Sequence, residues 1–439
     1  MKQTILVTGP VKTRSGYGNH ARDICRALIE LDKYEVIINS VRWGNTPMNA
    51  LEDGNDNHEA IKVRLLKTPK LPKQPDLHLH VVVPNEFTPV AKKNIGVTAG
   101  IETTVPVPEW INGMNRMDLN IVTSEFTKEG FERAKFEFQD EKTGQKGEVK
   151  NVKPMEVLFE GVDTDEYFET IDMDEDITEA FDKVDNDWNF LFTGHWLQGK
   201  IGEDRKDISM LIKVFCETFK NQKKRPGLIL KTSAASFSVL DREKMLSNIK
   251  SVKDSISGDL PKIYLLHGEL TDSQMNLLYN HPKVKAHISL THGEGFGRPL
   301  LEATQSGKPV IASAWSGQVD FLHKNYAVLL GGSLTKVPKG AFPKEMLFEE
   351  SQWFTANYQQ VSQVMVDVFK NYKKYLIKSK QLQLYCKNTF NFEKMKEKLD
   401  GIVTKMLSDI PQEVGLKLPK LQKVDSKKSE VKLPTLKKA

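Results

Sequence analysis

Short apolar runs alternate along the chain with segments whose apolar residues recur at helical spacing. Residues 5–7 form the first run, and the apolar residues that follow share one helix face: Ala21, Ile24, Leu28 and Leu31. Further apolar runs stand at residues 77–83, 120–124, 188–193, 228–230, 263–266, 284–290 and 310–312. Because strands that alternate with amphipathic helices form parallel sheets, the pattern predicts an α/β protein with doubly wound sheets.

The length and the charge distribution favour two domains. The 439 residues are too many for one ordinary core, and 39% of them are hydrophobic, which is enough for two cores. Residues 163–187 contain twelve carboxylates and one lysine, a composition typical of a solvated linker. Residues 136–153, in which charged residues and glycines alternate, are expected to form a surface excursion.

The most informative segment is rich in glycine and carries two glutamates, Glu294 and Glu302, separated by seven residues. The apolar run at 284–290 predicts a strand before it, Pro299 suits the first turn of a helix, and Gly307 marks the end of that helix. The segment therefore predicts strand, loop, helix and strand. In parallel sheets such a loop lies at the carboxyl edge, where ligands bind.

Glycines and acids at this spacing suit the binding of a diphosphate and of sugars. Gly293, Gly295 and Gly297 allow backbone N–H groups to approach an anion closely. Glu302, one turn into the helix, could accept two hydrogen bonds from a vicinal diol such as a ribose, and Glu294 could do the same for a transferred sugar. The alternative is a plain strand-to-helix turn whose glutamates only complement the helix dipole.

The chain here resembles a known family. Residues 294–303 and 307–313 look like the donor-site signature of group 1 (family four type) retaining glycosyltransferases of the GT-B fold. Weaker similarities occur in the family's order: residues 157–163 before Tyr167 and Phe168, residues 192–194 before Arg205 and Lys206, and residues 390–394. The resemblance covers residues 1–408 in outline and is strong from 185 to 330.

The resemblance implies two Rossmann-like doubly wound domains that face a cleft. The expected division is an N-terminal acceptor-side domain at 1–172, an acidic linker at 173–187, a C-terminal donor-binding domain at 188–390, a helix at 391–410 that crosses back to the N-terminal domain, and a disordered basic tail at 411–439.

Two cations stand directly before a predicted helix, Arg205 and Lys206, with Asp207 as the expected N-cap. Such a pair forms a second anion-binding corner, or else simply faces solvent. The resemblance places Lys206 at the family's phosphate-binding lysine. His195 stands where the family usually has an arginine, so Arg205 is expected to take that role.

The resemblance also gives the expected site. Glu294, Arg205 and Lys206 are the expected catalytic residues. The expected donor-binding residues are Gly295, Phe296, Gly297, Arg298, Pro299, Leu300 and Glu302.

The loop at residues 9–18 joins the first strand to the first helix and contains three glycines. It lacks the third glycine of a dinucleotide-binding fingerprint, which argues against a dehydrogenase. The resemblance places it on the acceptor side of the cleft, with Ser15, Gly16, Tyr17, Gly18 and Asn19 as candidates. Glu102, after the strand at 96–101, is a candidate acceptor contact. A plain tight turn and a loop cap are the respective alternatives.

No cofactor or metal is expected. His78 and His80 could share one face of a strand but have no third ligand nearby, and the pairs Asp163/Asp165 and Asp172/Asp174 belong to a turn and to a solvated charge run. Three cysteines far apart in sequence favour buried, reduced thiols.

The ends of the chain bear on location and partners. The N-terminus enters a strand at once, and no apolar run reaches membrane-spanning length, so a cytoplasmic protein without a membrane span is expected. Residues 412–439 hold eight lysines and three acids, a net charge of +5, equal to that of the whole chain. This tail is expected to be a solubilising extension or to bind DNA or a protein partner.

The sequence thus predicts a metal-independent retaining glycosyltransferase. It would move a sugar from a nucleotide-diphosphate-sugar donor to a hydroxyl of a carbohydrate, a lipid-linked acceptor or a modified DNA base. The alternatives are a non-catalytic nucleotide-sugar binder and a phosphorylase of the GT-B fold.

Overall fold

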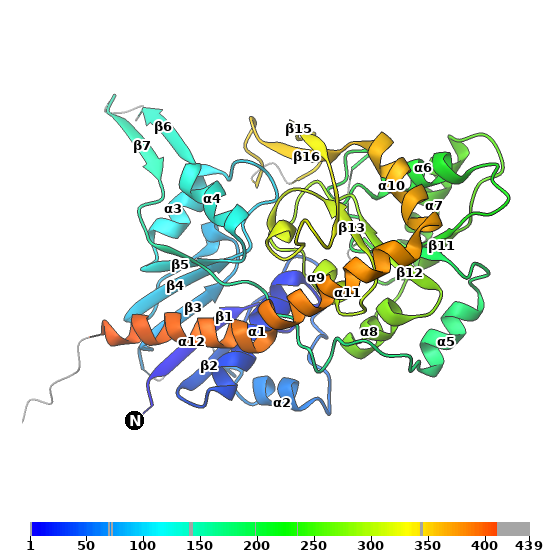
Figure 1. The fold of residues 1–439 in the computed structure, drawn as a ribbon. Coiled ribbons are helices and arrows are strands. Elements are labelled where there is room, and N and C mark those ends of the chain that lie inside the picture. The colour runs from blue at the N-terminus through cyan, green and yellow to red at the C-terminus, as the bar shows by residue number, and fades with distance from the viewer. Residues whose placement is uncertain are drawn as a thin grey trace, which may run out of the picture.

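The computed structural model describes residues 2–68, 71, 73–139, 144–197, 199–234, 236–342 and 346–410. The predictions for the tail at 411–439 lie outside the described residues. The rest folds into two α/β halves that lie side by side, each built on a six-stranded parallel sheet (Figure 1). The predicted α/β class with two doubly wound sheets is confirmed.

The N-terminal sheet has the strand order β2-β1-β3-β4-β5-β8, and all its neighbours pair in parallel. Its strands are β1 (Thr4–Gly9), β2 (Glu35–Ser40), β3 (Leu77–Val81), β4 (Lys93–Thr98), β5 (Leu119–Val122) and β8 (Met155–Val157). The direction of winding reverses between β1 and β3. A ligand crevice is expected at such a reversal, outside the carboxyl ends of the strands.

The C-terminal sheet has the order β11-β10-β9-β12-β13-β14, again entirely parallel. Its strands are β9 (Asn189–Thr193), β10 (Gly227–Lys231), β11 (Ile263–Leu266), β12 (Val284–Ser289), β13 (Val310–Ser313) and β14 (Val328–Leu330). Here the reversal lies between β9 and β12. The glycine-rich segment follows β12 directly, so it emerges at the reversal point.

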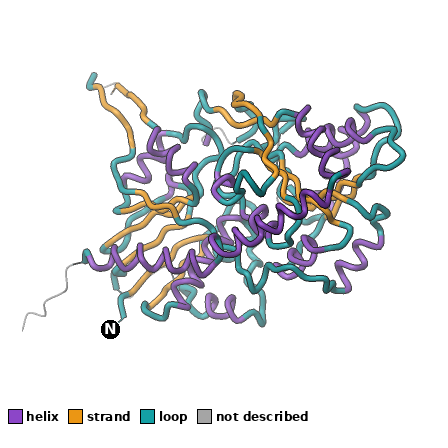
Figure 2. The backbone as a smooth tube through the Cα atoms, in the orientation of Figure 1, coloured by secondary structure: helices purple, strands orange, loops and turns teal. Residues whose placement is uncertain are grey.

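Helices flank both sheets (Figure 2). They are α1 (Gly16–Glu30), α2 (Asp56–Lys62), α3 (Pro108–Asn115), α4 (Glu125–Arg133), α5 (Glu175–Asp182), α6 (Ile208–Phe219), α7 (Val239–Asp254), α8 (Asp272–Asn280), α9 (Arg298–Thr304), α10 (Tyr358–Lys370), α11 (Tyr372–Thr389) and α12 (Phe392–Ser408), with short 3-10 turns at Pro84–Glu86 and Gly317–Asp320. Ser124 caps α4 and Thr271 caps α8, each with a side-chain oxygen that accepts a backbone N–H.

The first helix begins earlier than the predicted loop allows. Residues 9–18 were expected to form a loop, but α1 starts at Gly16 because the Ser15 side chain accepts a hydrogen bond from the backbone N–H of Gly18 at 3.0 Å. A Cβ atom on Gly18 would lie 2.2 Å from the carbonyl oxygen of Thr13. Only glycine therefore fits at position 18, where the loop lies close to the helix that follows it.

The acidic segment at 173–187 contains the helix α5. Asp174 caps it, and Ile177 and Phe181 are buried in a core that also includes Phe296 and Leu301 of the C-terminal half. An amphipathic helix with carboxylates in its first turn explains the composition, because acids complement the positive end of a helix.

Two antiparallel strand pairs form separate two-stranded sheets: β6 (Lys135–Gln139) with β7 (Lys146–Lys150), and β15 (Gly332–Lys336) with β16 (Gln352–Ala356). The segment before β16 reaches the N-terminal half, where Ser351 Oγ donates to the carbonyl of Val105 at 2.9 Å and the ring of Phe348 lies 5.0 Å from that of Phe136. This segment therefore bridges the two halves.

The last helices connect the halves a second time. α11 and α12 run in succession from the C-terminal to the N-terminal half (Figure 2). On α12, Met395, Leu399 and Val403 are fully buried in one core with α1 and the N-terminal strands. Helix α12, the last described helix, thus completes the core of the N-terminal half.

Replacement of Leu399 by alanine should destabilise the N-terminal half by about 2–5 kcal/mol, because the cavity would open between α12 and a packed core. Urea denaturation followed by circular dichroism measures the loss. Lys398→Ala, at an exposed position of the same helix, is the control. Equal stability of the two variants would contradict the docking of α12.

Candidate active site

Residues from both halves meet beyond the carboxyl ends of β9 and β12. Lys206 Nζ contacts Glu294 Oε1, and Arg205 Nη1 lies 3.3 Å from Glu294 Oε2. The same Arg205 atom donates to the carbonyl of Gly293 at 2.9 Å and lies 3.1 Å from Oε1 of Glu102, on the loop after β4. We call Glu102, Arg205, Lys206 and Glu294 the Arg205 network. Four residues that the sequence singles out are therefore in contact.

The network fixes the ionisation of its central carboxylate. Glu294 is 8% exposed, and burial alone would raise its pKa. The neighbouring charges of Lys206 and Arg205 outweigh burial, so the pKa of Glu294 lies below its usual value. For Lys206, burial and the charge of Arg205 lower the pKa, and Glu294 opposes them.

The backbone of Glu294 is held by the turn after β13. Its N–H donates to Ser316 Oγ at 2.9 Å, and its carbonyl accepts from the N–H of Gly317 at 2.9 Å. A Cβ atom on Gly317 would lie 2.0 Å from the carbonyl oxygen of Gly295. The turn therefore lies so close to the glycine-rich loop that only glycine fits at position 317.

The glycines of the loop face the N-terminal half. A Cβ atom on Gly293 would lie 2.5 Å from the carbonyl oxygen of Glu102, and one on Gly295 would lie 2.4 Å from that of Ala99. Ser124 Oγ donates to the carbonyl of Gly295 at 2.6 Å. Contact with the other half thus explains why positions 293 and 295 are glycine. Gly297 has a φ of +100°, a conformation that glycine adopts readily and that the turn into α9 requires.

Glu302 belongs to a second ionic group. Its Oε1 accepts from Arg298 Nε at 2.8 Å, and its Oε2 accepts from Tyr279 OH at 3.4 Å. Arg298 also forms an ion pair with Asp23 on α1. We call Asp23, Arg298 and Glu302 the Arg298 bridge, because it connects the two halves. Burial raises the pKa of Glu302 to about 7, although the charge of Arg298 opposes this shift.

Other predicted donor-site residues have their side chains in the core. Phe296 is 2% exposed and Leu300 8%, and both pack in the hydrophobic core of the C-terminal half. Pro299 lies in the first turn of α9, as its fixed φ suggests. The side chains of Phe296 and Leu300 are therefore not presented to a ligand.

The predicted acceptor-side residues mostly hold the N-terminal half together. Tyr17 OH shares a hydrogen bond with Thr98 Oγ1 at 2.8 Å, and its ring stacks on Trp43. Ser15 caps α1, and Asn19 accepts from Arg22. Among the candidates on this side, Glu102 is the one whose side chain joins the Arg205 network.

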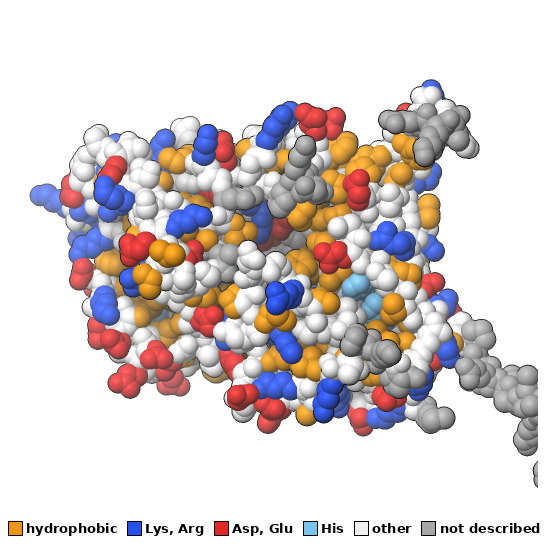
Figure 3. All heavy atoms as spheres, turned by 180° about the vertical axis from the view of Figure 1, so that it is seen from behind, with side chains coloured by type: hydrophobic (Ala, Val, Ile, Leu, Met, Phe, Trp, Pro, Cys, Tyr) orange, Lys and Arg blue, Asp and Glu red, His pale blue; other side chains and the backbone are white. Residues whose placement is uncertain are grey.

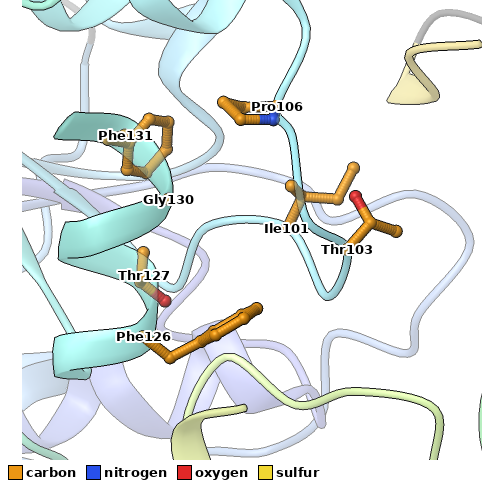
Figure 4. Close-up of a pocket in the computed structure, with 7 residues that line it drawn as sticks. All are labelled: Ile101, Thr103, Pro106, Phe126, Thr127, Gly130 and Phe131. Atoms are coloured by element: carbon orange, nitrogen blue, oxygen red, sulfur yellow. The ribbon is translucent and has the colours of Figure 1, made fainter. Parts of the chain in front are cut away.

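A shallow hollow adjoins Glu102 along the chain. It lies between α4 and the loop after Gly100 (Figure 4) and is lined by Ile101, Thr103, Pro106, Phe126, Thr127, Gly130 and Phe131. The lining is mostly apolar and includes no member of the Arg205 network or the Arg298 bridge. The hollow is therefore separate from the ionic site.

The predicted N-cap Asp207 has the expected position but not the expected contacts. Its φ of +54° is left-handed, and its side chain makes no capping bond. Asp204 caps α6 instead, with its Oδ1 accepting from the N–H of Ile208 at 2.9 Å. Asp207 Oδ2 accepts from Tyr358 OH at 2.8 Å, so its carboxylate is turned away from the helix.

Sequence reasoning missed Asp23, Glu160, Tyr279 and His292. Glu160 follows β8, is 6% exposed, and has a pKa that burial raises to about 8 although Arg298 opposes the shift. Its place after a strand was a usable signal, since polar residues at strand ends often face a site. Asp23 and Tyr279 sit inside helices, where nothing in the sequence distinguishes them.

His78 and His80 of β3 are both buried, and His78 Nε2 lies 2.9 Å from Thr8 Oγ1. Within the ranges that the structure describes, no cluster of three or more His, Cys, Asp or Glu side chains could hold a metal ion, and no helix has the length and hydrophobicity to cross a membrane. Cys25, Cys216 and Cys386 are buried and free.

Acidic and basic side chains are interspersed on the face shown in Figure 3.

Comparison with known proteins agrees with this architecture. The model of the family described as "Glycosyl transferases group 1" matches residues 257–338, which include the whole glycine-rich segment. No curated protein sequence matches the chain significantly.

Several solved structures share the fold. HepE from Anabaena in complex with UDP-glucose has a TM-score of 0.60 at 12% identity, over 92% of this chain and 99% of that one. Sucrose-phosphate synthase from Thermosynechococcus elongatus has 0.62 at 12% identity, over 93% and 100%. A glycosyltransferase from Rickettsia africae has 0.60 at 16% identity, over 93% and 100%. Residues 257–338 therefore match the group 1 glycosyltransferase family, and the chain as a whole has the GT-B fold of these structures.

Proposed function

We propose that the protein transfers a sugar, with retention of configuration, from a UDP-sugar donor to a hydroxyl acceptor. The observation that carries the proposal is the Arg205 network, in which two cations meet the first glutamate of the motif at the reversal point of a parallel sheet. The similar fold of HepE, which is described in complex with UDP-glucose, supports UDP as the nucleotide.

The donor's diphosphate is proposed to bind at Arg205 and Lys206. In the described part of the chain, the ion pairs and hydrogen bonds of the Arg205 guanidinium all run through Nη1. Its Nε and Nη2 groups can therefore donate to phosphate oxygens, and the ammonium of Lys206 has three donors. These cations supply the charge compensation that a divalent ion gives in metal-dependent transferases, so the proposed reaction is metal-independent.

Catalysis follows from where charge develops. The bond between the anomeric carbon and the β-phosphate oxygen breaks, the electron pair stays on UDP, and the acceptor oxygen bonds to the same carbon as its proton passes to a β-phosphate oxygen of UDP. Negative charge on the leaving diphosphate grows in the transition state, so fixed cations bind the transition state more tightly than the ground state. Glu294 would orient the sugar, and Glu102 would lie on the acceptor side.

The ribose of the donor is proposed to bind Glu302. A carboxylate can accept two hydrogen bonds from a vicinal diol. In the structure Glu302 Oε1 accepts a hydrogen bond from Arg298 Nε. The ribose must therefore displace Arg298 from this oxygen or share the oxygen with it. Because Arg298 also pairs with Asp23, donor binding and the contact between the halves are linked.

A panel of nucleotide sugars tests the proposal directly. Mass spectrometry and calorimetry should show binding of a UDP-sugar, and incubation without an acceptor should show slow release of UDP by hydrolysis. Binding without hydrolysis or transfer to any acceptor would favour the non-catalytic binder, and failure to bind any nucleotide sugar would refute the proposal.

Replacement of Lys206 by alanine should lower kcat by about 10²–10³-fold, because one of the cations that stabilise the leaving group is lost. The rate of UDP release from the donor is the measurement. Lys223→Ala removes an exposed lysine and serves as the matched control. Unchanged turnover in Lys206→Ala would exclude it from leaving-group stabilisation.

The affinity for UDP-glucose should rise with pH near neutrality. Glu302 has a pKa of about 7, and only its ionised form accepts both diol hydrogen bonds. The affinity should therefore increase about tenfold from pH 6 to pH 8, since the diphosphate of UDP-glucose does not titrate in this range. Calorimetry at the two pH values measures the change.

Glu302→Gln should bind UDP-glucose more weakly and without this pH dependence. Glu160→Gln removes a second buried glutamate whose pKa is raised, to about 8, and should keep the pH dependence. The same pH dependence in Glu302→Gln as in the wild type would assign the titration to another group.

A further inference from the structure

Two buried side chains behind the Arg205 network face each other without another described partner at the facing atoms. His292 Nε2 lies 3.7 Å from Asp207 Oδ1, and the side chains are 1% and 0% exposed. Among the described residues neither atom has a hydrogen-bond partner. Asp207 directly follows Lys206, and His292 is two residues before Glu294. The pair therefore joins the two loops that carry the network.

The remaining atoms of both side chains are fixed. Asp207 Oδ2 accepts from Tyr358 OH at 2.8 Å. The imidazole of His292 stacks on Trp353, with ring centroids 3.9 Å apart and planes within 10°, and its Nδ1 lies 2.6 Å from the carbonyl oxygen of Phe354. A carbonyl oxygen can only accept a hydrogen bond, so Nδ1 carries a proton.

The facing atoms then require a second proton. If His292 were neutral and Asp207 ionised, a nitrogen lone pair would face a carboxylate oxygen between two side chains that are at most 1% exposed, and neither atom would have a described donor. One proton placed on either atom removes this repulsion, and the separation of 3.7 Å lies within ion-pair range. The facing atoms therefore carry one proton between them.

We propose that Asp207 and His292 share one proton and act as a positioning pair that holds the loop of Arg205 and Lys206 against the loop of Glu294. The proposal rests on the proposed function, because it assigns the pair a role in placing the phosphate-binding cations.

The titration behaviour of the two groups is consistent with a proton on the acid. Burial raises the pKa of Asp207 well above its usual value, with the hydrogen bond from Tyr358 opposing the shift. Burial lowers the pKa of His292 to about 4, and the hydrogen bond to the carbonyl of Phe354 opposes the shift.

The surroundings show what the loss of this proton would do. The charged and titratable groups facing the pair are Asp204 and Arg205 from the loop before α6, and Tyr358 from α10, while β16 contributes only neutral groups. An ionised Asp207 beside a neutral His292 would add unpaired negative charge next to Asp204 at a buried position, which is strongly unfavourable.

Backbone contacts transmit the position of the pair to the network. The N–H of His292 donates to the carbonyl of Arg205 at 2.9 Å, and the carbonyl of His292 accepts from the N–H of Phe354 at 3.0 Å. Separation of Asp207 from His292 would loosen the first of these contacts. Arg205 and Lys206 would then lose their alignment with Glu294, although neither side chain had changed.

Two variants at Asp207 separate positioning from folding. Glycine tolerates the left-handed φ of +54° and removes the carboxyl, so Asp207→Gly breaks the pair without backbone strain. Asparagine also tolerates this conformation, and its amide can donate to His292 Nε2 without titrating. Hydrolysis of UDP-glucose without an acceptor, measured from pH 6 to pH 10, and calorimetric binding of UDP are the assays.

Asp207→Gly should lower kcat at least tenfold at neutral pH, and Asp207→Asn should restore most of it. The wild type should lose activity at alkaline pH as the pair gives up its proton, and Asp207→Asn should lack this loss. Full activity of Asp207→Gly, or the same alkaline loss in Asp207→Asn as in the wild type, would overturn the proposal.

The proton itself can be observed by 15N NMR of histidine-labelled protein, with His292→Gln used to assign the signal. In the wild type Nδ1 should be protonated and the Nε2 shift should differ from that of a free lone pair, and Asp207→Gly should return Nε2 to the value of a free lone pair. An unprotonated Nδ1 would refute the pair. If the wild type binds no UDP, the proposed function fails, and this measurement still decides whether the proton is shared.

Discussion

The structure of the site depends on one buried carboxylate held between two cations. A charge at 8% exposure is costly unless it is paired, and Glu294 is paired with both Arg205 and Lys206. This requirement brings the loop after β9 to the loop after β12. Because Arg205 also pairs with Glu102, the same constraint holds the N-terminal half against the C-terminal half.

A second charged connection acts at a different point of the interface. Arg298 pairs with Glu302 on its own helix and with Asp23 on α1, and the halves also meet through glycines whose Cβ atoms would collide with backbone. Both charged connections involve an acid of the motif. A ligand that engages Glu294 and Glu302 would therefore compete with, or join, the contacts that keep the halves together.

Local signals made much of the fold and part of the site predictable from the sequence. The strand–loop–helix–strand unit around Pro299 depends on neighbours in sequence, and it was predicted. The Arg298–Asp23 pair joins residues 275 positions apart, which no local pattern reveals. The left-handed conformation of Asp207 was missed for another reason: aspartate is a common N-cap, and only the fold shows that Asp204 takes that role.

The two glutamates of the motif show why spacing alone could not determine their chemistry. They are equally buried, yet the pKa of Glu294 is lowered and that of Glu302 is raised to about 7. The difference comes from their partners, because two cations contact Glu294, whereas Glu302 shares one arginine with Asp23 and feels the negative charge of Asp272. Environments that push the pKa values of paired acids apart assign them different roles. A permanently ionised Glu294 is suited to orienting a substrate beside fixed cations, and a Glu302 that titrates near neutrality links binding at its position to proton release.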